Sequence, residues 1–366
     1  MFCRVQMIAI VVGIAATAGG ATLRVPSQYP NIQAAMNAAL AGDTVLVADG
    51  TYTGPGNNSL SFGFKDFTVR SENGPEGCII DCEGLALGFW FSGEGPGSIL
   101  DGFTITNGLG FPAGGIFCYY NSDPTLTNLI ITGNEGGGDG GGGIYCALAN
   151  PTISNCTITA NTATDLGKGG GIYCLMSSPT ISNCTIAGNT AGDSGGGVYC
   201  SEGSSPTIID SIIRENGPDQ FSLDAFSAVS ASYSNIDGGW IGEGNTDADP
   251  LFVNPAGNDY HLSPGSPCID AGDPTHAPQM GETDIDGEPR LMGCRVDMGA
   301  DETMAGQPNS GDLDADGVVN LSDVPLFVNA LLATPDPAAE CVADINGDGN
   351  SDGKDVQEFV DALIAS

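Results

Sequence analysis

Two stretches near the C-terminus, residues 312–323 and 344–355, place side-chain oxygens at the spacing that a calcium ion requires. Both begin and end with an aspartate, and a glycine at the sixth position, Gly317 or Gly349, permits a sharp turn. Calcium prefers carboxylate, amide and backbone carbonyl oxygens, so we predict two calcium ions, one in each loop. The expected ligands are Asp312, Asp314, Asp316, the Val318 carbonyl and Asp323, followed by Asp344, Asn346, Asp348, the Asn350 carbonyl and Asp355.

Each loop is followed by an apolar stripe at helical spacing. The stripes consist of Val324, Phe327, Val328, Leu331 and Leu332, and of Val356, Phe359, Val360, Leu363 and Ile364. Two such helices can bury their stripes against each other, but the resulting core is thin. Without metal the clustered carboxylates would repel one another, so we expect calcium binding to drive the folding of this module.

This duplicated loop–helix arrangement, with Asp in place of Glu at the last loop position, resembles a type I dockerin domain over residues 311–366. The resemblance implies a calcium-binding module that docks onto a cohesin-like or cell-surface scaffold protein. It also implies that the tenth and eleventh positions of each loop contact this partner. Those positions hold Leu321, Ser322, Gly353 and Lys354.

The larger part of the chain, residues 23–245, is built from repeated units. Near copies of the segment Gly-Gly-Ile-Tyr-Cys end at Cys118, Cys146, Cys174 and Cys200, and a Pro-Thr dipeptide and a closing asparagine follow each copy. A nearly fixed period of this kind indicates a solenoid, and the alternation of residue types inside each unit indicates short strands. We therefore expect one coil per unit in a parallel β-helix, with neighbouring coils about 4.8 Å apart.

The units also predict sharp bends and ladders of like residues. Ile153 and Ile158 would face opposite sides by simple alternation, so a bend at Asn155 must reset the phase. Asparagine tolerates the left-handed conformation that such a bend needs. We expect the thiols to stack as small apolar core residues, with a metal or redox site as the alternative. The equivalent bends are Asn128, Asn183 and Asp210, and the thiol ladders are Cys118, Cys146, Cys174 and Cys200, and Cys156 with Cys184.

An open solenoid end exposes strand edges and needs a cap. Apolar residues at helical spacing predict a capping helix over residues 31–40, followed by a first strand at residues 44–47. The segment from Pro30 to Tyr52 resembles the N-terminal cap and first coil of pectin-lyase-like right-handed parallel β-helix proteins. The resemblance implies an all-β solenoid with a small α-helical calcium-binding domain behind it. Because this fold hosts lyases, hydrolases, esterases, adhesins and inert surface proteins, it implies no particular activity.

Residues 246–302 lack the sequence pattern of the repeats and resemble the segment that often closes surface β-helix proteins before an attachment module. Residues 303–310 are polar and contain glycine and proline, which is typical of a linker. Cys268 and Cys294 are a predicted disulfide of this closing segment, and closing their loop would stabilise it by a few kcal/mol.

Both histidines of the chain, His261 and His276, lie in the closing segment. Neither stands at a recognisable ligand spacing, and a catalytic or metal-binding role is the less favoured alternative. The nearby acidic residues are expected to be solvated turn residues, with a further calcium site as the alternative. They are Asp270, Asp273, Asp284 and Asp286.

The start of the chain predicts export. A short positive start, an apolar run too short to span a bilayer and a small-residue cleavage site predict a signal peptide over residues 1–20. We therefore expect a secreted, extracellular or cell-surface monomer with no membrane span in the mature chain. The formal charge of −36 at pH 7 would repel a phosphate backbone, which excludes nucleic acid as a partner.

The repeats do not reveal an enzyme. A polysaccharide lyase typically uses calcium together with Lys or Arg, but the basic residues of the repeats form no cluster in sequence. They are Arg24, Lys65, Arg70, Lys168 and Arg214. A glycoside hydrolase needs two opposed carboxylates, for which equivalent turns and a late coil offer weak candidates. These are Asp139, Asp165, Asp193, Asp210 and Glu215.

The rival class is a non-catalytic surface protein that engages polysaccharide or envelope components through rows of polar side chains. Tyr119, Tyr145, Tyr173 and Tyr199 are expected near one line, where sugar rings could stack. We favour this class. The alternative is a polysaccharide-degrading enzyme, either a pectate-lyase-like lyase or an O-glycosyl hydrolase, attached by its dockerin. A convergent charged cleft on one β-helix face would support the alternative.

Overall fold

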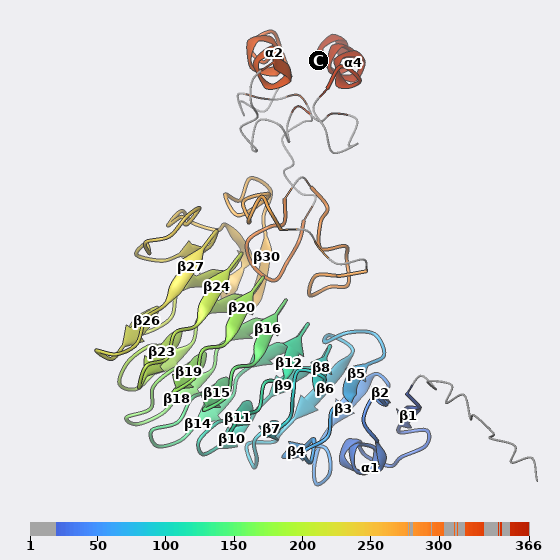
Figure 1. Cartoon of the computed structure of the whole chain (residues 1–366), viewed down its shortest axis with the longest axis vertical. Helices are drawn as coiled ribbons and strands as arrows, with labels where there is room; N and C mark the ends of the chain where they lie inside the picture. Colours follow the sequence, from blue (N-terminus) through green and yellow to red (C-terminus); the bar gives the residue numbers. More distant parts are fainter. Residues whose placement is uncertain are drawn as a thin grey trace, which may run out of the picture.

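The computed structural model describes residues 20–276, 278, 281–293, 295–303, 311, 313, 319–332, 343, 345 and 352–365. Short parallel strands stack coil upon coil from β1 to β28, which Figure 1 shows as a ladder running from blue to yellow. A complete coil contributes one strand to each of four sheets, which we name A to D. The predicted parallel β-helix is therefore confirmed.

The strands fall into the four sheets in a regular order along the chain. Sheet A holds β1 (Thr22–Val25), β2 (Thr44–Val47), β5 (Thr68–Ser71), β8 (Ile99–Asp101), β12 (Thr125–Thr127), β16 (Thr152–Ser154), β20 (Thr180–Ser182), β24 (Thr207–Ile209) and β27 (Ser230–Ser232). Sheet B holds β3 (Gly50–Tyr52), β6 (Cys78–Asp81), β9 (Thr104–Thr106), β13 (Ile130–Thr132), β17 (Thr157–Thr159), β21 (Thr185–Ala187), β25 (Ile212–Arg214) and β28 (Asn235–Ile236). Sheet C holds β4 (Leu60–Ser61), β7 (Phe89–Ser92), β11 (Ile116–Tyr119), β15 (Ile144–Ala147), β19 (Ile172–Leu175), β23 (Val198–Ser201) and β26 (Phe221–Leu223). Sheet D holds β10 (Leu109–Gly110), β14 (Glu135–Gly136), β18 (Thr162–Ala163) and β22 (Thr190–Ala191).

The interior is filled by stacked small and aliphatic side chains. Cys118, Cys146, Cys174 and Cys200 are in register on sheet C, and all four are completely buried. These thiols are unpaired, so the structure bears out the predicted ladder of small core residues. Hydrogen bonding to a neighbouring thiol, together with burial, raises the pKa of Cys146 and of Cys174 well above the usual range, which keeps both protonated and unreactive.

Two asparagine ladders shape the coils. Asn128, Asn155 and Asn183 stand at the bend between sheets A and B with φ of 52°, 51° and 51°, as the sequence predicts. A second ladder lies inside, where Asn161 donates from Nδ2 to Asn189 Oδ1 at 3.0 Å. Each buried amide of this inner ladder also donates to a backbone carbonyl, so the ladder satisfies polar groups that the core would otherwise leave unpaired.

Both ends of the solenoid are covered. Helix α1 (Ile32–Ala38) caps the N-terminal end, where Asn31 accepts the Ala34 N–H at 2.9 Å. The buried residues of α1 pack against the first coils, which confirms the predicted cap. At the other end, the partly buried Trp240 packs on the core and its ring lies 4.7 Å from that of Phe221.

The closing segment runs along the flank of the solenoid, over sheet B. It contains β29 (Phe252–Asn254), the 3-10 helix η1 (Pro255–Gly257) and β30 (Asp259–Leu262), with β30 visible beside the late coils in Figure 1. Thr159 and Thr185 point outward from sheet B yet are only 1% and 2% exposed. Ala300 donates its N–H to Thr185 Oγ1 at 3.1 Å, so the segment is anchored directly on the sheet.

The C-terminal region contains α2 (Val324–Leu332) and α4 (Asp355–Ala365). The rings of Phe327 and Phe359 stack at 4.0 Å, and Val324, Leu331 and Leu363 pack around them. The predicted stripes are only half right, because their remaining members are exposed. These are Val328, Leu332, Val356, Val360 and Ile364. Among the described residues, no helix is both long and apolar enough to cross a bilayer.

Candidate functional site

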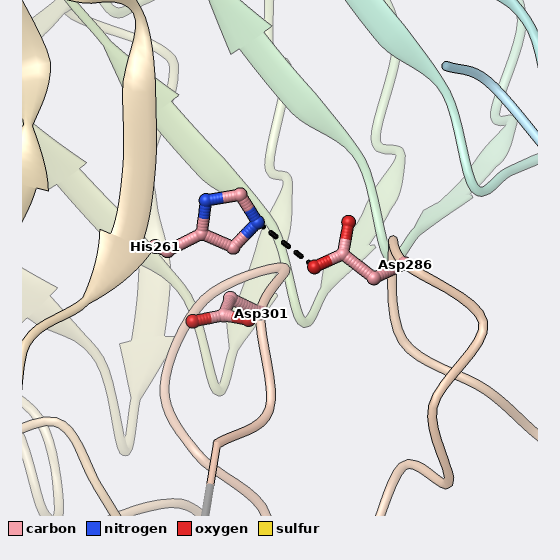
Figure 2. Close-up of side chains that lie close together, drawn as sticks. All are labelled: His261, Asp286 and Asp301. Atoms are coloured by element: carbon pink, nitrogen blue, oxygen red, sulfur yellow. Dashed lines mark hydrogen bonds and ion pairs between the residues drawn. The ribbon is translucent and has the colours of Figure 1, made fainter. Parts of the chain in front are cut away.

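Three stretches of the closing segment converge on one imidazole above sheet B. His261 comes from β30, Asp286 from a turn that Asp284 and Gly287 close, and Asp301 from a later stretch (Figure 2). His261 Nε2 lies 2.8 Å from Asp286 Oδ2, and Nδ1 lies 2.5 Å from Asp259 Oδ1. We call His261, Asp259, Asp286 and Asp301 the His261 cluster.

The carboxylates of this cluster decide the protonation of its histidine. Asp286, and after it Asp259, raises the pKa of His261 to about 10 by hydrogen bonding. With this pKa, His261 is an imidazolium at neutral pH. An imidazolium has no free lone pair to accept a proton, so His261 does not act as a general base in this state.

Buried carboxylates around Arg290 hold the loops of the closing segment. Arg290 is completely buried, pairs with Glu302 at 3.2 Å and donates to the backbone carbonyls of Asp297 and Ala300. Burial raises the pKa of Asp297 to about 7 and that of Glu302 to about 8. Asp284 is also buried and accepts three backbone N–H groups, which corrects the prediction that it is a solvated turn residue. It is buried because it fixes the turn that presents Asp286.

A groove of about 750 Å³ runs between the closing segment and the corner where sheets A and B meet. Arg70, Glu72 and Asp101 line it from the coils, and Glu282 and Asp286 line it from the closing segment. Acidic groups prevail in this groove, so its field attracts cations and disfavours an acidic polysaccharide.

Sheet A offers a surface of a different kind. The outward side chains of β12, β16, β20, β24 and β27 stack in two rows that keep strict register. These rows are Thr125, Thr152, Thr180, Thr207 and Ser230, and Thr127, Ser154, Ser182, Ile209 and Ser232. Every position except Ile209 carries a hydroxyl, and none carries a charge, although the chain as a whole has a formal charge of −36. We call this surface the hydroxyl face.

The aromatic row on sheet C differs from the predicted one. Phe117, and not Tyr119, is in register with Tyr145, because Tyr119 lies two residues further along the strand and pairs with Ala147. Tyr145 and Tyr173 are only 9% and 8% exposed, and their ring centroids are 4.5 Å apart. These rings cover one another and pack against the sheet, so they offer no open stacking surface to a sugar.

Of the expected calcium ligands, the structure describes Asp323 and Asp355. Both are completely buried. Asp323 accepts the N–H groups of Leu313 at 2.7 Å and Asn320 at 2.8 Å, and Asp355 accepts that of Asp352 at 2.7 Å. Each carboxylate thus ties its loop to the start of α2 or α4. The other predicted ligands, which lie outside the described residues, are Asp312, Asp314, Asp316, Val318, Asp344, Asn346, Asp348 and Asn350.

Comparison with known families identifies the family of the chain. The family described as right handed beta helix region matches residues 42–178 and 97–246, which together cover more than half of the chain. The chain belongs to this family. Residues 310–363 match the dockerin type I domain, a kind of domain that generally binds calcium and docks onto cohesins.

Two further comparisons concern individual proteins. Among solved structures, the crystal structure of pectate lyase Pel9A is similar with a TM-score of 0.33 and 15% identity, over 78% of this chain and 97% of that chain. Among curated proteins, no sequence matches the chain.

The dockerin positions predicted to contact a partner are on the surface. Leu321 is 78% exposed, and Ser322, Gly353 and Lys354 are exposed as well. Lys354 Nζ lies 3.3 Å from Asp352 Oδ2 in an exposed ion pair. Their role in docking stays a prediction.

The disulfide predicted between Cys268 and Cys294 also stays a prediction. Cys268, which belongs to the closing segment, is completely buried and accepts a hydrogen bond from Asn235 Nδ2 at 3.3 Å. Cys294 lies outside the described residues.

Sequence reasoning missed the His261 cluster and the hydroxyl face. The cluster joins residues far apart in a segment without a repeat, so no spacing could reveal it. The hydroxyl face had a signal in the Thr-x-Thr and Thr-x-Ser triplets that follow Pro124, Pro151 and Pro179, and stacking of equivalent positions would have predicted most of both rows.

Proposed function

We propose that this chain is a secreted or cell-surface β-helix protein that engages polysaccharide through its hydroxyl face and is tethered by its calcium-binding dockerin domain. The observation that carries the proposal is the uncharged hydroxyl face itself. In a chain with this excess of acid, a broad neutral surface is a specific feature, and it suits a neutral ligand that hydrogen-bonds. A neutral glycan presents hydroxyls of its own and brings no charge that the chain would repel.

The geometry of the face supports a glycan that lies along the solenoid axis. Hydroxyls repeat once per coil, about 4.8 Å apart, which is close to the length of one pyranose unit. Thr152, Thr180 and Ser230 are exposed, whereas Thr159 and Thr185 on sheet B are buried under the closing segment. The aromatic row of sheet C is also covered, so sheet A is the favoured surface.

The tether is supported by the dockerin match and by the two buried aspartates that close the loops onto their helices. Calcium would be held by the oxygens of the two loops, and we propose one ion in each. A cohesin or a cohesin-like scaffold protein is the proposed docking partner, and Leu321, Ser322, Gly353 and Lys354 are its proposed contacts.

A pull-down on insoluble glycans tests the β-helix part of the proposal. Purified protein is incubated with neutral glycans, such as cellulose and mannan, and with polygalacturonate. The Thr152→Glu/Thr180→Glu variant places two charges on the hydroxyl face, and Thr162→Glu/Thr190→Glu places the same charges on sheet D of the same coils. We expect neutral glycans to retain the wild type and the sheet D variant but not the hydroxyl-face variant. Equal retention of both variants, or retention on polygalacturonate alone, would refute the proposal.

The acidic groove favours a second candidate, a glycoside hydrolase. Asp101 lines the coil wall and Asp286 the wall formed by the closing segment, so carboxylates face the groove from both sides. Both are already engaged, since Asp101 accepts from Asn128 Nδ2 at 2.8 Å and Asp286 contacts His261. For this reason we rank the hydrolase second.

A reducing-end assay on the same glycans separates the two candidates. The hydrolase predicts new reducing ends that disappear in Asp101→Asn and persist in Asp193→Asn, which changes an exposed turn residue instead. The binding protein predicts retention without new reducing ends in all three proteins.

A further inference from the structure

We propose that His261, Asp286 and Asp301 form a binding site for one divalent transition-metal ion, such as Zn²⁺, which joins three stretches of the closing segment to one another above sheet B. This site is separate from the calcium loops of the dockerin domain. It is also independent of whether the hydroxyl face binds glycans.

The ligand atoms are already gathered. One nitrogen of His261 and one carboxylate oxygen each of Asp286 and Asp301 all lie within 4.8 Å of one another. Zinc binds imidazole nitrogen and carboxylate oxygen at about 2.0–2.2 Å, so its ligand atoms lie somewhat over 3 Å apart. The three atoms would have to move closer together by side-chain rotation when the ion binds. Figure 2 shows Nε2 of the imidazole directed at Asp286, with Asp301 beside it.

The Nδ1 atom of His261 is hydrogen-bonded to a carboxylate, as is common in metal-binding histidines. Asp259 Oδ1 lies 2.5 Å from Nδ1, so it accepts the Nδ1 proton, and Nε2 is the nitrogen that would lose its proton to bind a metal ion. Metal-binding histidines commonly donate their other N–H to a carboxylate, which orients the ring and raises its basicity. Asp259 is therefore assigned as the positioning residue of the site.

The charge of the cluster calls for a cation. Three carboxylates surround one imidazole, and Glu76 lies at the edge of the same small cavity. Arg290 is engaged elsewhere, by Glu302 at 3.2 Å. A proton on His261 supplies only one positive charge, whereas a divalent ion that replaces it supplies two. A divalent ion would therefore balance the carboxylates of the cluster better than a proton on His261 does.

There is space for the remaining coordination position. A cavity of about 150 Å³ adjoins His261, Asp286 and Asp301, with Thr132 and Tyr260 in its walls. It can hold the water that completes a site with three protein ligands. The polar walls would in turn hydrogen-bond to that water.

The site would serve a structural need. Each ligand belongs to a different stretch of the closing segment, and beyond β30 the described residues of that segment form no helix or named strand. Segments of this kind commonly depend on a disulfide or a metal ion for stability. One ion bound by three stretches would join them at a single point above sheet B.

Cobalt substitution tests the proposal on the full chain. Calcium in excess first saturates the dockerin loops, and Co²⁺ is then titrated while visible absorption and thermal stability are recorded. A site with an imidazole ligand gives visible d–d bands that an all-oxygen calcium loop does not match in strength. We expect one equivalent of Co²⁺ to produce these bands, to raise the melting temperature, and to be displaced by Zn²⁺.

Three variants identify the ligands. His261→Gln and Asp286→Asn are expected to weaken Co²⁺ binding at least about tenfold, whereas His276→Gln, which changes the other histidine of the same segment, is expected to leave it unchanged. Asp286 is exposed, so its variant should fold even if His261→Gln does not. The absence of saturable bands in the wild type, or bands that survive Asp286→Asn undiminished, would overturn the proposal and leave the cluster as an ion pair only.

Discussion

The imidazole Nδ1 of His276, in the closing segment, lies 3.1 Å from Oδ2 of Asp210, a completely buried carboxylate of the β-helix. Asp210 adopts φ 51° at the bend between sheets A and B, where the preceding coils carry asparagine. It also accepts the Asp273 N–H at 2.6 Å. Asp210 therefore forms the bend of its own coil and also anchors the closing segment to that coil.

Replacing Asp210 with asparagine should loosen this attachment without disturbing the coil. Asn is the residue of the equivalent bends, and its oxygen can still accept the Asp273 N–H, so only the charged contact with His276 is lost. A charge-assisted hydrogen bond is worth about 1.5 kcal/mol, so we expect backbone hydrogen exchange around residues 270–276 to accelerate about tenfold. Exchange in the inner strands should not change.

The same variant makes a prediction about pH. The hydrogen bond to Asp210 raises the pKa of His276 above its unfolded value near 6.5. Stability from this contact is therefore fully present below pH 6.5 and is lost as the pH rises through the folded value. NMR titration should show a raised His276 pKa in the wild type and a value near 6.5 in Asp210→Asn. An identical pKa in both proteins would show that the contact does not exist in solution.

The inner asparagine ladder should be the most sensitive part of the solenoid. Asn161 is completely buried, donates to the Ile131 carbonyl at 2.8 Å and accepts from Asn134 Nδ2 at 2.9 Å. Asn161→Ala leaves these groups unpaired, which should lower the free energy of unfolding by about 3 kcal/mol. Urea denaturation measures the loss. Thr152→Ala, on the surface of the same coil, should change stability by less than about 0.5 kcal/mol, and equal effects would contradict the role of the ladder.

The thiol ladder should behave as apolar filling. Cys146 is completely buried, and its raised pKa leaves no thiolate for alkylation. We expect iodoacetamide to label it only after unfolding. Cys146→Ala should lower stability by about 1 kcal/mol, and Cys146→Ser by more, because a serine hydroxyl would be buried among apolar groups. Labelling in the native state, or a stabilising effect of serine, would argue for a reactive site instead.

The repeat made most of this fold predictable. Because coils of equal length must stack, the positions of Cys146 and Cys174, the bend at Asn155 and the capping helix all followed from spacing alone. The prediction for Tyr119 was wrong, although the repeat itself aligns Phe117 with Tyr145, since each directly precedes a ladder cysteine.

The closing segment could not be predicted in the same way. It has no repeat, and its contacts join distant residues, as with Asn155, whose Nδ2 donates to the Thr283 carbonyl. In the sequence Asp284 resembles any turn aspartate, yet in the structure it is buried and accepts three backbone N–H groups, which fix the surrounding turn. Structural roles of this kind depend on how loops pack on a surface, which local sequence rules do not describe.

Calcium removal should affect the dockerin domain alone. Asp323 and Asp355 are buried acidic groups that belong to the predicted calcium loops, and their neighbours in those loops add further negative charge. We expect a chelator to reduce helical circular dichroism while the β-sheet signal of the solenoid remains. Asp323→Asn and Asp355→Asn should each require more calcium to restore the helices. Helical signal that is indifferent to chelator would contradict the predicted metal sites.

A bridging assay tests the central claim most directly. Particles of an insoluble neutral glycan are incubated with the full chain and a fluorescent type I cohesin, with calcium and then with excess chelator. The account predicts that the cohesin binds the particles only when both the chain and calcium are present, and that chelator releases the cohesin while the chain stays on the glycan. A chain that fails to hold the particles, or a cohesin signal that does not depend on calcium, would contradict it.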